Sequence, residues 1–143
     1  MIEVRIIDLK KDVLLYKEQR ELRNKILLRP IGMPDYGWEM FDSESFHFIA
    51  LSNNEVAGCA LLCPKEDSAK LMQMAVDDSF QNKGIGQAIV AKILEFSKTK
   101  KIKNIFCHSR ENAVSFYEKC GFRTFGEVFK EVEINHIKMV IEL

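Results

Sequence analysis

The stretch from Gln81 to Gln87 places two glycines and a lysine where an amphipathic helix is expected to begin. The first N–H groups of a helix have no partner within the helix and carry about half a positive charge. Gly84 and Gly86 have no Cβ, so a phosphate can approach those N–H groups closely, and Lys83 adds a full charge. The pattern therefore indicates an anion site, with a tight strand-to-helix turn as the plain alternative.

Two well-known phosphate loops do not match this stretch. A dinucleotide fingerprint needs a third glycine or alanine three residues after the second glycine, and Ile89 occupies that position. A Walker A loop needs Gly-Lys-Ser/Thr after four spacer residues, and the chain has no such run. The spacing therefore excludes both a Rossmann-type dinucleotide loop and a P-loop.

The loop instead resembles the acyl-CoA pyrophosphate loop of the GCN5-related N-acetyltransferase (GNAT) superfamily, Gln/Arg-x-x-Gly-x-Gly/Ala. Gln81, Gly84 and Gly86 match that pattern. A second motif, Asn-x4-Tyr-x3-Gly-Phe, begins at Asn112, contains Tyr117 and ends at Phe122. The two motifs follow one another in the order and at the separation typical of the superfamily. The resemblance covers nearly the whole chain and is similar in detail to a branch of small bacterial single-domain members.

The resemblance implies an enzyme that moves an acetyl group from acetyl-CoA directly to a primary amine, without a metal. In the superfamily a tyrosine at the position of Tyr117 acts as general acid, and its alternative role here is a core aromatic. Asn112 is implied to lie beside the pantetheine arm, and its alternative role is a helix N-cap. The residues implied to bind acetyl-CoA are Met74, Ala75, Val76, Gln81, Asn82, Lys83, Gly84, Ile85, Gly86, Gln87, Asn112, Phe116 and Tyr117.

The general base does not follow from the sequence. An amine of pKa about 10.4 must lose a proton before it attacks, at a cost of roughly 4 to 5 kcal/mol at pH 7. Many GNAT enzymes carry a glutamate on the strand before the loop, where this chain has Lys70, Met72 and Gln73. Proton loss through water is one alternative. The candidate bases suggested by residue type and by the resemblance are His136, Glu39 and His47.

The irregular segment from Arg29 to Asp42 is expected to select the acceptor, a small-molecule or peptide amine. Two prolines and two glycines interrupt this segment, and it concentrates aromatic and acidic side chains that suit a cationic amine. The alternative is a packed lid or a dimer contact, so a homodimer is compatible with the same residues. The candidate acceptor contacts are Tyr36, Trp38, Glu39 and Asp42.

Hydrophobic periodicity predicts the elements that must position these residues. Strands are expected over residues 2–7, 45–52, 56–63, 71–76, 104–108, 122–129 and 132–142. Helices are expected from Asp12, which can cap the first, to Leu28, from Ile85 to Lys100 and through the second motif, with a short helical turn over residues 38–41. This order of strands and helices indicates a mixed α/β fold. The resemblance implies a GNAT fold, a mixed and mostly antiparallel sheet of about seven strands flanked by about four helices.

Composition narrows the class of protein. The length of 143 residues suits a single domain, 1–143, and 21 basic residues balance 21 acidic residues, so the overall charge calls for neither nucleic acid nor a membrane surface. No apolar run approaches the roughly 18 residues of a membrane span, and the N-terminus lacks a signal-peptide core, so a cytoplasmic protein is expected. The four cysteines form no CxxC pair and suit reduced core thiols.

Two classes of function are compatible with these residues. One is an acetyl-CoA-dependent N-acetyltransferase, and the other is a GNAT-fold protein that binds acyl-CoA as a sensor or partner without transferring the acyl group. Retention of Tyr117 together with the complete first loop favours the enzyme.

Overall fold

The computed structural model describes all 143 residues. Its strands are β1 (Ile2–Ile7), β2 (Phe46–Ser52), β3 (Glu55–Lys65), β4 (Ser68–Val76), β5 (Asn104–Arg110), β6 (Arg123–Glu131) and β7 (Ile134–Glu142). Its α-helices are α1 (Val13–Arg23), α2 (Ile85–Thr99) and α3 (Val114–Lys119). A π-helix, η1 (Asn24–Leu28), continues α1, and 3₁₀ segments lie at η2 (Arg29–Ile31), η3 (Asp42–Glu44), η4 (Asp78–Phe80) and η5 (Glu111–Ala113).

The seven strands form one mixed sheet in the order β1-β2-β3-β4-β5-β7-β6. All neighbouring strands are antiparallel except β4 and β5, which run parallel and are connected through α2. The hairpin between β2 and β3 turns at Asn53 and Asn54, whose φ angles of 49° and 67° suit the type I′ turn expected of such a pair. The predicted order of strands along the chain and the mostly antiparallel sheet of about seven strands are therefore confirmed.

The helices differ from the sequence prediction in three respects. The structure has three α-helices rather than about four, because the remaining helical segments are 3₁₀ or π turns of three to five residues. Residues 38–41 form turns, and the 3₁₀ helix follows them at Asp42–Glu44. Asp12 is the N-cap residue of α1, but its carboxylate accepts the backbone N–H of Asp8 at 2.8 Å and makes no capping bond to the helix.

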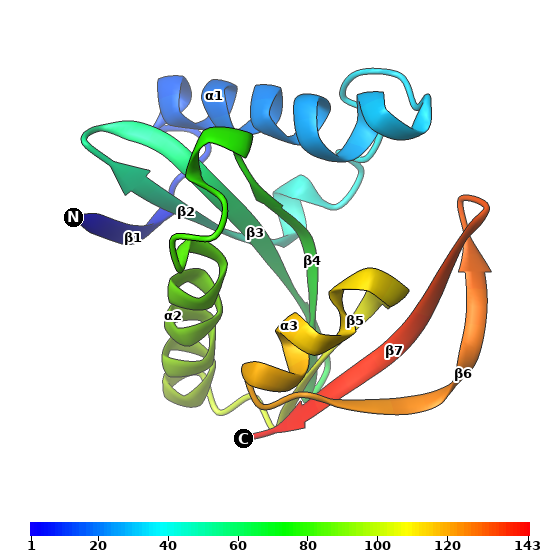
Figure 1. Ribbon diagram of the computed structural model, residues 1–143. Coiled ribbons are helices and arrows are strands. Elements are labelled where there is room, and N and C mark those ends of the chain that lie inside the picture. The colour runs from blue at the N-terminus through cyan, green and yellow to red at the C-terminus, as the bar shows by residue number, and fades with distance from the viewer.

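Strands β4 and β5 separate soon after they begin. Their parallel pairing covers three positions, from Ser68 beside Asn104 to Lys70 beside Phe106, and the two strands then diverge (Figure 1). The β3–β4 register shifts in the same region, and Gln73 of β4 has a φ of 56°, so β4 carries a bulge that bends it. The divergence leaves the edge of β4 that faces β5 unpaired beyond Lys70.

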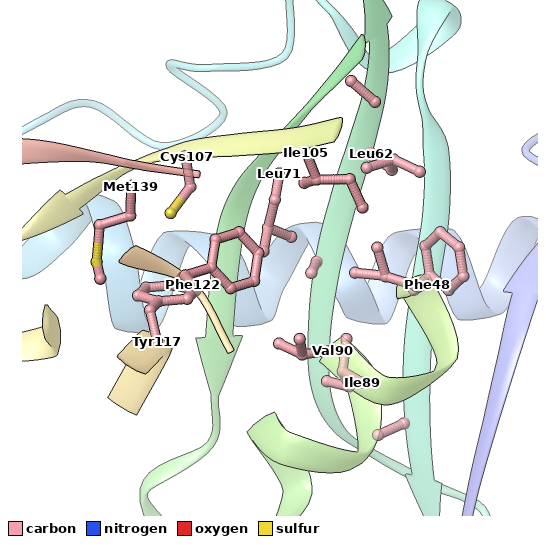
Figure 2. Packing of buried hydrophobic residues seen from close by; sticks show 14 of the residues in the cluster. Phe48, Leu62, Leu71, Ile89, Val90, Ile105, Cys107, Tyr117, Phe122 and Met139 are labelled. Carbon is pink, nitrogen blue, oxygen red and sulfur yellow. The ribbon is translucent and has the colours of Figure 1, made fainter. Parts of the chain in front are cut away.

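Hydrophobic side chains fill both faces of the sheet. The larger cluster lies between the sheet and helices α2 and α3 and includes Phe48, Leu71, Ile89, Tyr117 and Met139 (Figure 2). A smaller cluster joins α1 to the other face and includes Leu22, Ile49 and Ala75. The two layers of helices therefore hold β4 from opposite sides, at the point where it leaves β5.

Candidate active site

A cavity of about 1050 Å³ occupies the gap between β4 and β5. Residues that line it on the α2 and α3 side include Gly84, Gly86, Asn112, Phe116 and Tyr117. Residues that line it on the α1 side include Ile26, Leu27, Trp38, Met40 and Phe41. The end of β6, the following turn and β7 contribute Glu131, Val132 and His136. The cavity is large enough for a cofactor and a second ligand, and it is accessible from both layers of the fold.

Strand alternation decides which side chains of β5 face which layer. Ile105 and Cys107 are buried in the cluster that contains Tyr117, so they point toward α3. Because successive side chains of a strand point to opposite faces, His108 and Arg110 project to the α1 side. The two sides of the cavity therefore carry different groups, with Tyr117 and the start of α2 on one side and His108 and Arg110 on the other.

The start of α2 presents free backbone donors to the cavity. Gly84 is the N-cap residue with a φ of 80°, and Ala88 donates the first intrahelical hydrogen bond to the Gly84 carbonyl at 3.0 Å. The N–H groups of residues 85–87 precede that bond and so have no partner within the helix. The side chain of Gln81 donates to the Val76 carbonyl at 3.2 Å, which ties the loop to the end of β4.

Most of the residues expected to bind the cofactor line this cavity. They are Met74, Val76, Gln81, Asn82, Gly84, Ile85, Gly86, Gln87, Asn112, Phe116 and Tyr117. Ala75 packs instead in the cluster on the α1 side, and Lys83 lies near the ring of Phe80, with Nζ 5.8 Å from the ring centroid. Asn112 lies within η5 and is not the N-cap residue of α3, a position that Ala113 takes, so its alternative role as a helix cap is not supported.

Tyr117 belongs both to the core and to the cavity. Its ring packs edge-on against Phe116 and Phe122, with centroid separations of 5.0 and 5.6 Å, and only 8% of the residue is exposed. Burial raises the pKa of the phenol well above its ordinary value, and the nearby Cys107 and Cys120 raise it further. A phenol is protonated at neutral pH even at its ordinary pKa of about 10, so Tyr117 is in the form that a general acid needs, and its place at the cavity is compatible with both roles considered for it.

His136 is better placed to accept a proton than Glu39. The Nδ1 atom of His136 lies 2.8 Å from the Ile134 carbonyl, which can only accept, so Nδ1 carries a hydrogen and Nε2 is the acceptor when the ring is neutral. His136 lines the cavity. Glu39 does not line it, and its two carboxylate oxygens accept from Arg20 at 2.7 and 2.9 Å. The structure therefore favours His136 over Glu39 as candidate base.

A second histidine lies on the same face. The Nδ1 atom of His108 is 3.0 Å from a carboxylate oxygen of Glu131, which leaves Nε2 of His108 as an acceptor when the ring is neutral. The ring of Phe129 lies between the two histidines, 5.1 Å from His108 and 6.0 Å from His136. Sequence reasoning missed this pair, since Glu131 reaches His108 only through the β5-β7-β6 strand order. Alternation along β5 was the one available signal.

Comparison with known proteins assigns the family. The sequence model of the family described as an acetyltransferase (GNAT) domain matches residues 34–143. The chain belongs to the GNAT family. An acetyltransferase of Bacillus subtilis is 28% identical to this GNAT chain over 123 residues, which cover 83% of the chain and 84% of the relative. The predicted superfamily is therefore confirmed, and acetyltransferase activity is the activity of the family.

Solved structures show the same GNAT fold. Escherichia coli ElaA superposes with a TM-score of 0.84 at 20% identity, over 99% of this chain and all of that one. A Bacillus subtilis acetyltransferase, solved in complex with CoA, superposes with a TM-score of 0.73 at 20% identity, over all of this chain and 99% of that one. The predicted fold class is confirmed across the full length of the chain.

Gly86→Val is expected to raise the Kd for acetyl-CoA more than tenfold while the GNAT domain stays folded. A Cβ at Gly86 would lie 3.0 Å from two ring atoms of Phe116, so a branched side chain must displace that ring, which lines the same cavity. Isothermal titration calorimetry measures the change. The matched control is Ala91→Val, which places the same new side chain at an exposed position of α2. Unchanged affinity in folded Gly86→Val would contradict the placement of the cofactor.

Only part of the segment from Arg29 to Asp42, which was expected to contact the acceptor, lines the cavity. Trp38 lines the cavity together with Met40 and Phe41. Tyr36 is 47% exposed and stacks on Arg20, with a separation of 4.5 Å between the guanidinium carbon and the ring centroid. Asp42 is buried away from the cavity. Of the four expected acceptor contacts, the structure brings only Trp38 to the cavity.

Asp42 belongs to a buried polar network that supports the β4 bulge. Its carboxylate accepts two hydrogen bonds from Arg23, each of 2.9 Å, and one of 2.6 Å from the Tyr16 hydroxyl. Arg23 Nε also donates to the side chain of Gln73 at 3.0 Å, and Gln73 donates to the Trp38 carbonyl at 2.7 Å. Gln73 is the residue with positive φ in β4. The network therefore links α1, the acceptor segment and the bulge that shapes the cavity.

His47 completes this network in its neutral form. Its Nε2–H donates to the Asp42 carbonyl at 2.8 Å, and its Nδ1 lies 2.8 Å from Gln19 Nε2. The Gln19 Oε1 atom accepts from Arg23 at 3.1 Å, which fixes the amide so that Nδ1 must accept. A protonated ring would bring two donors together. Burial lowers the pKa of His47 from its ordinary value, and the network opposes protonation in the same direction.

The free energy of unfolding is therefore expected to fall as the pH drops below about 6.5, the pKa of histidine in an unfolded chain. The unfolded chain then binds a proton that the folded protein does not bind. The free energy of unfolding therefore falls by at most about 1.4 kcal/mol per pH unit for one such group. Urea titrations at pH 7.5 and pH 5 measure the effect. His47→Gln should remove most of the slope, whereas His108→Gln should keep it. If the free energy of unfolding of His47→Gln still falls with pH as in the wild type, groups other than His47 cause the dependence.

The cysteines form no disulfide. All four cysteines are free, and Cys59, Cys63 and Cys107 are buried. Burial raises the pKa of Cys59 and of Cys107 to about 12, so both are thiols at neutral pH. No helix is long and apolar enough to span a membrane.

Proposed function

We propose that this GNAT protein transfers an acetyl group from acetyl-CoA to a primary amine within the cavity between β4 and β5. The observation that carries the proposal is the meeting of three kinds of group at one cavity: free N–H donors at the start of α2, the protonated phenol of Tyr117, and two imidazoles, His108 and His136. An anion site, an acid and a base are the groups that acetyl transfer to an amine requires.

The start of α2 and the free edge of β4 fit coenzyme A. The N–H groups of residues 85–87 suit a pyrophosphate, and the close contact of Gly86 with Phe116 leaves no room there for a side chain. Beyond Lys70, β4 has no strand partner on the side of β5, so the backbone groups of Met74 to Val76 on that edge suit the amides of a pantetheine arm. The related Bacillus subtilis structure holds CoA in the same fold.

The acid and the base lie on opposite sides of the cavity. Acetyl-CoA supplies an acyl thioester that an amine can attack. Tyr117 gives its proton to the departing thiolate, for which a pKa of about 8.5 is a fair stand-in. Nε2 of His136 or of His108 accepts the proton of the amine, directly or through a water. The amine then approaches from the α1 side, past Trp38.

Acyl-CoA binding without transfer is the second candidate function, since it would use the same loop and strand edge. The presence of a phenol in the lining of the cavity favours transfer, because a binding protein needs no proton donor at the thioester.

Mass spectrometry of acceptors incubated with the protein and acetyl-CoA tests the proposal. We expect an acetylated amine that is absent when the protein is omitted, and binding of acetyl-CoA without any acetylated product would support the second candidate. A crystal structure with CoA tests the geometry: the sulfur should lie beside residues 74–76, and a sulfur outside the β4–β5 gap would refute the placement.

A further inference from the structure

The charged side chains on the α1 side of the cavity indicate the chemistry of the acceptor. We infer that the acceptor carries a carboxylate or a phosphate a few bonds from its primary amine, and that Arg110 binds this anion. The inference rests on the proposed function, because it names the class of amine that this site would accept.

Positive charge outweighs negative charge in this part of the cavity. Glu131 is the one carboxylate residue that lines the cavity, and it is engaged by His108 at 3.0 Å. Lys70 and Arg110 also line the cavity, and neither takes part in any of the ion pairs of the chain. Two half-buried cations without a carboxylate partner favour an anionic ligand.

The carboxylates that would favour a cationic ligand are already neutralised. Glu39 makes a bidentate pair with Arg20, and neither residue lines the cavity. Asp42 makes a bidentate pair with Arg23, and both of these side chains are almost fully buried, with 6% and 3% exposed. The acidic character of the acceptor segment therefore does not reach the cavity, contrary to the expectation from the sequence.

Arg110 lies next to the candidate base. It is the direct cross-strand partner of His136 in the β5–β7 ladder, so their Cβ atoms are about 5 Å apart. A guanidinium presents paired N–H donors that match a carboxylate or a phosphate. An amine that reaches Nε2 of His136 can therefore place an anion on Arg110 when only a few bonds separate the two groups. Lys70 lies beside Phe106, about 13 Å back along β5, and adds to the positive potential.

Arg110 is poorly placed to bind the phosphates of the donor. The loop of residues 81–87 and α3 lie on the other face of the sheet from His108 and Arg110. The buried Cys107 and Ser109 alternate with these two residues along β5 and point to the face that carries α3. Lys70 likewise alternates with the buried Ala69 and Leu71 of the cluster facing α2 and α3. Both cations therefore belong to the acceptor side of the cavity.

Matched amine pairs test the inference. β-Alanine is compared with β-alaninamide, and O-phosphoethanolamine with ethanolamine, by kcat/KM for thiol release from acetyl-CoA. We expect the wild-type protein to prefer the anionic member of at least one pair by roughly tenfold or more, the scale of one charged hydrogen-bond pair. Which pair shows the preference distinguishes a carboxylate from a phosphate. A preference for the neutral members would overturn the inference.

Variants locate the preference. Arg110→Gln should reduce it to under about threefold, while calorimetric affinity for CoA stays within about twofold of wild type. Lys119→Gln removes a cation that lines the cavity on the α3 side and should keep the preference. Loss of CoA affinity in Arg110→Gln, with the preference intact, would assign Arg110 to the donor site and overturn the inference.

A binding measurement separates this inference from the proposed function. The CoA-loaded protein is titrated with the same four amines by calorimetry, which needs no turnover. Suppose that no amine is acetylated, but that the anionic members bind at least tenfold more tightly and lose this advantage in Arg110→Gln. The proposal of acetyl transfer is then wrong, while the proposed anion site is supported. If amines are acetylated without preference, the anion site fails alone.

Discussion

Tyr117→Phe is expected to lower kcat about 10²- to 10⁴-fold, the usual loss when a general acid is removed. The ring should pack as before against Phe116 and Phe122, because only the hydroxyl is lost. Affinity for acetyl-CoA should change by less than about 1.5 kcal/mol, the scale of one neutral hydrogen bond. Single-turnover rates measured beside calorimetric affinities separate the two effects.

The acidity of the leaving thiol provides an internal check on Tyr117. Acyl donors with a more acidic thiol need protonation less, so the rate loss in Tyr117→Phe should shrink with them. Tyr16→Phe is the matched control: it removes a phenol that bonds Asp42 outside the cavity, and kcat should be kept at a temperature where the variant is folded. If chemistry limits the rate and Tyr117→Phe keeps wild-type kcat, the acid is water or another residue.

Asp42→Ala is expected to lower the free energy of unfolding by about 3–5 kcal/mol. The substitution leaves the guanidinium of Arg23, whose side chain is 3% exposed, without its carboxylate. Tyr16 loses its acceptor at the same time. Urea denaturation monitored by circular dichroism measures the change.

The half-buried pair between Glu39 and Arg20 is the control for Asp42. Glu39→Ala breaks the pair with Arg20, whose side chains are 24% and 32% exposed, and should cost about 1 kcal/mol or less. Replacing both partners of the buried pair, in Arg23→Met with Asp42→Leu, should recover part of the loss, since no charge is then left buried alone. A loss below about 1 kcal/mol in Asp42→Ala would show that Arg23 finds another partner or water.

The elements of the fold could be predicted because they have short-range causes. Apolar residues at three- and four-residue steps predicted α2, and the alternation of β1 and β4 predicted strands. The two glycines placed the start of α2 within the loop, and Gly84 is its N-cap residue. Each of these features depends on neighbours within about one turn of helix or a few residues of strand.

The features that could not be predicted depend on contacts between distant residues. Asp42 and Glu39 have the composition of an amine site, but arginines 19 residues earlier in the chain hold both of them. The bulge at Gln73 depends on an arginine 50 residues away. Hydrogen bonds of this range leave no periodic trace in a sequence.

The cavity combines both kinds of feature. Glycine spacing and the position of Tyr117 were apparent from the sequence, whereas the pairing of Glu131 with His108 required the strand order β5-β7-β6. The same strand order places Arg110 beside His136, so the charge of the acceptor side became apparent only from the structure.

The most direct test of acetyl transfer is the initial rate of CoA thiol release, measured with acetyl-CoA and a panel of primary amines. We predict release that requires both substrates, saturates with each, and is strongly reduced in Gly86→Val and in Tyr117→Phe. Tight binding of acetyl-CoA with no amine-dependent release across the panel would contradict transfer and identify the protein as an acyl-CoA binding member of its family.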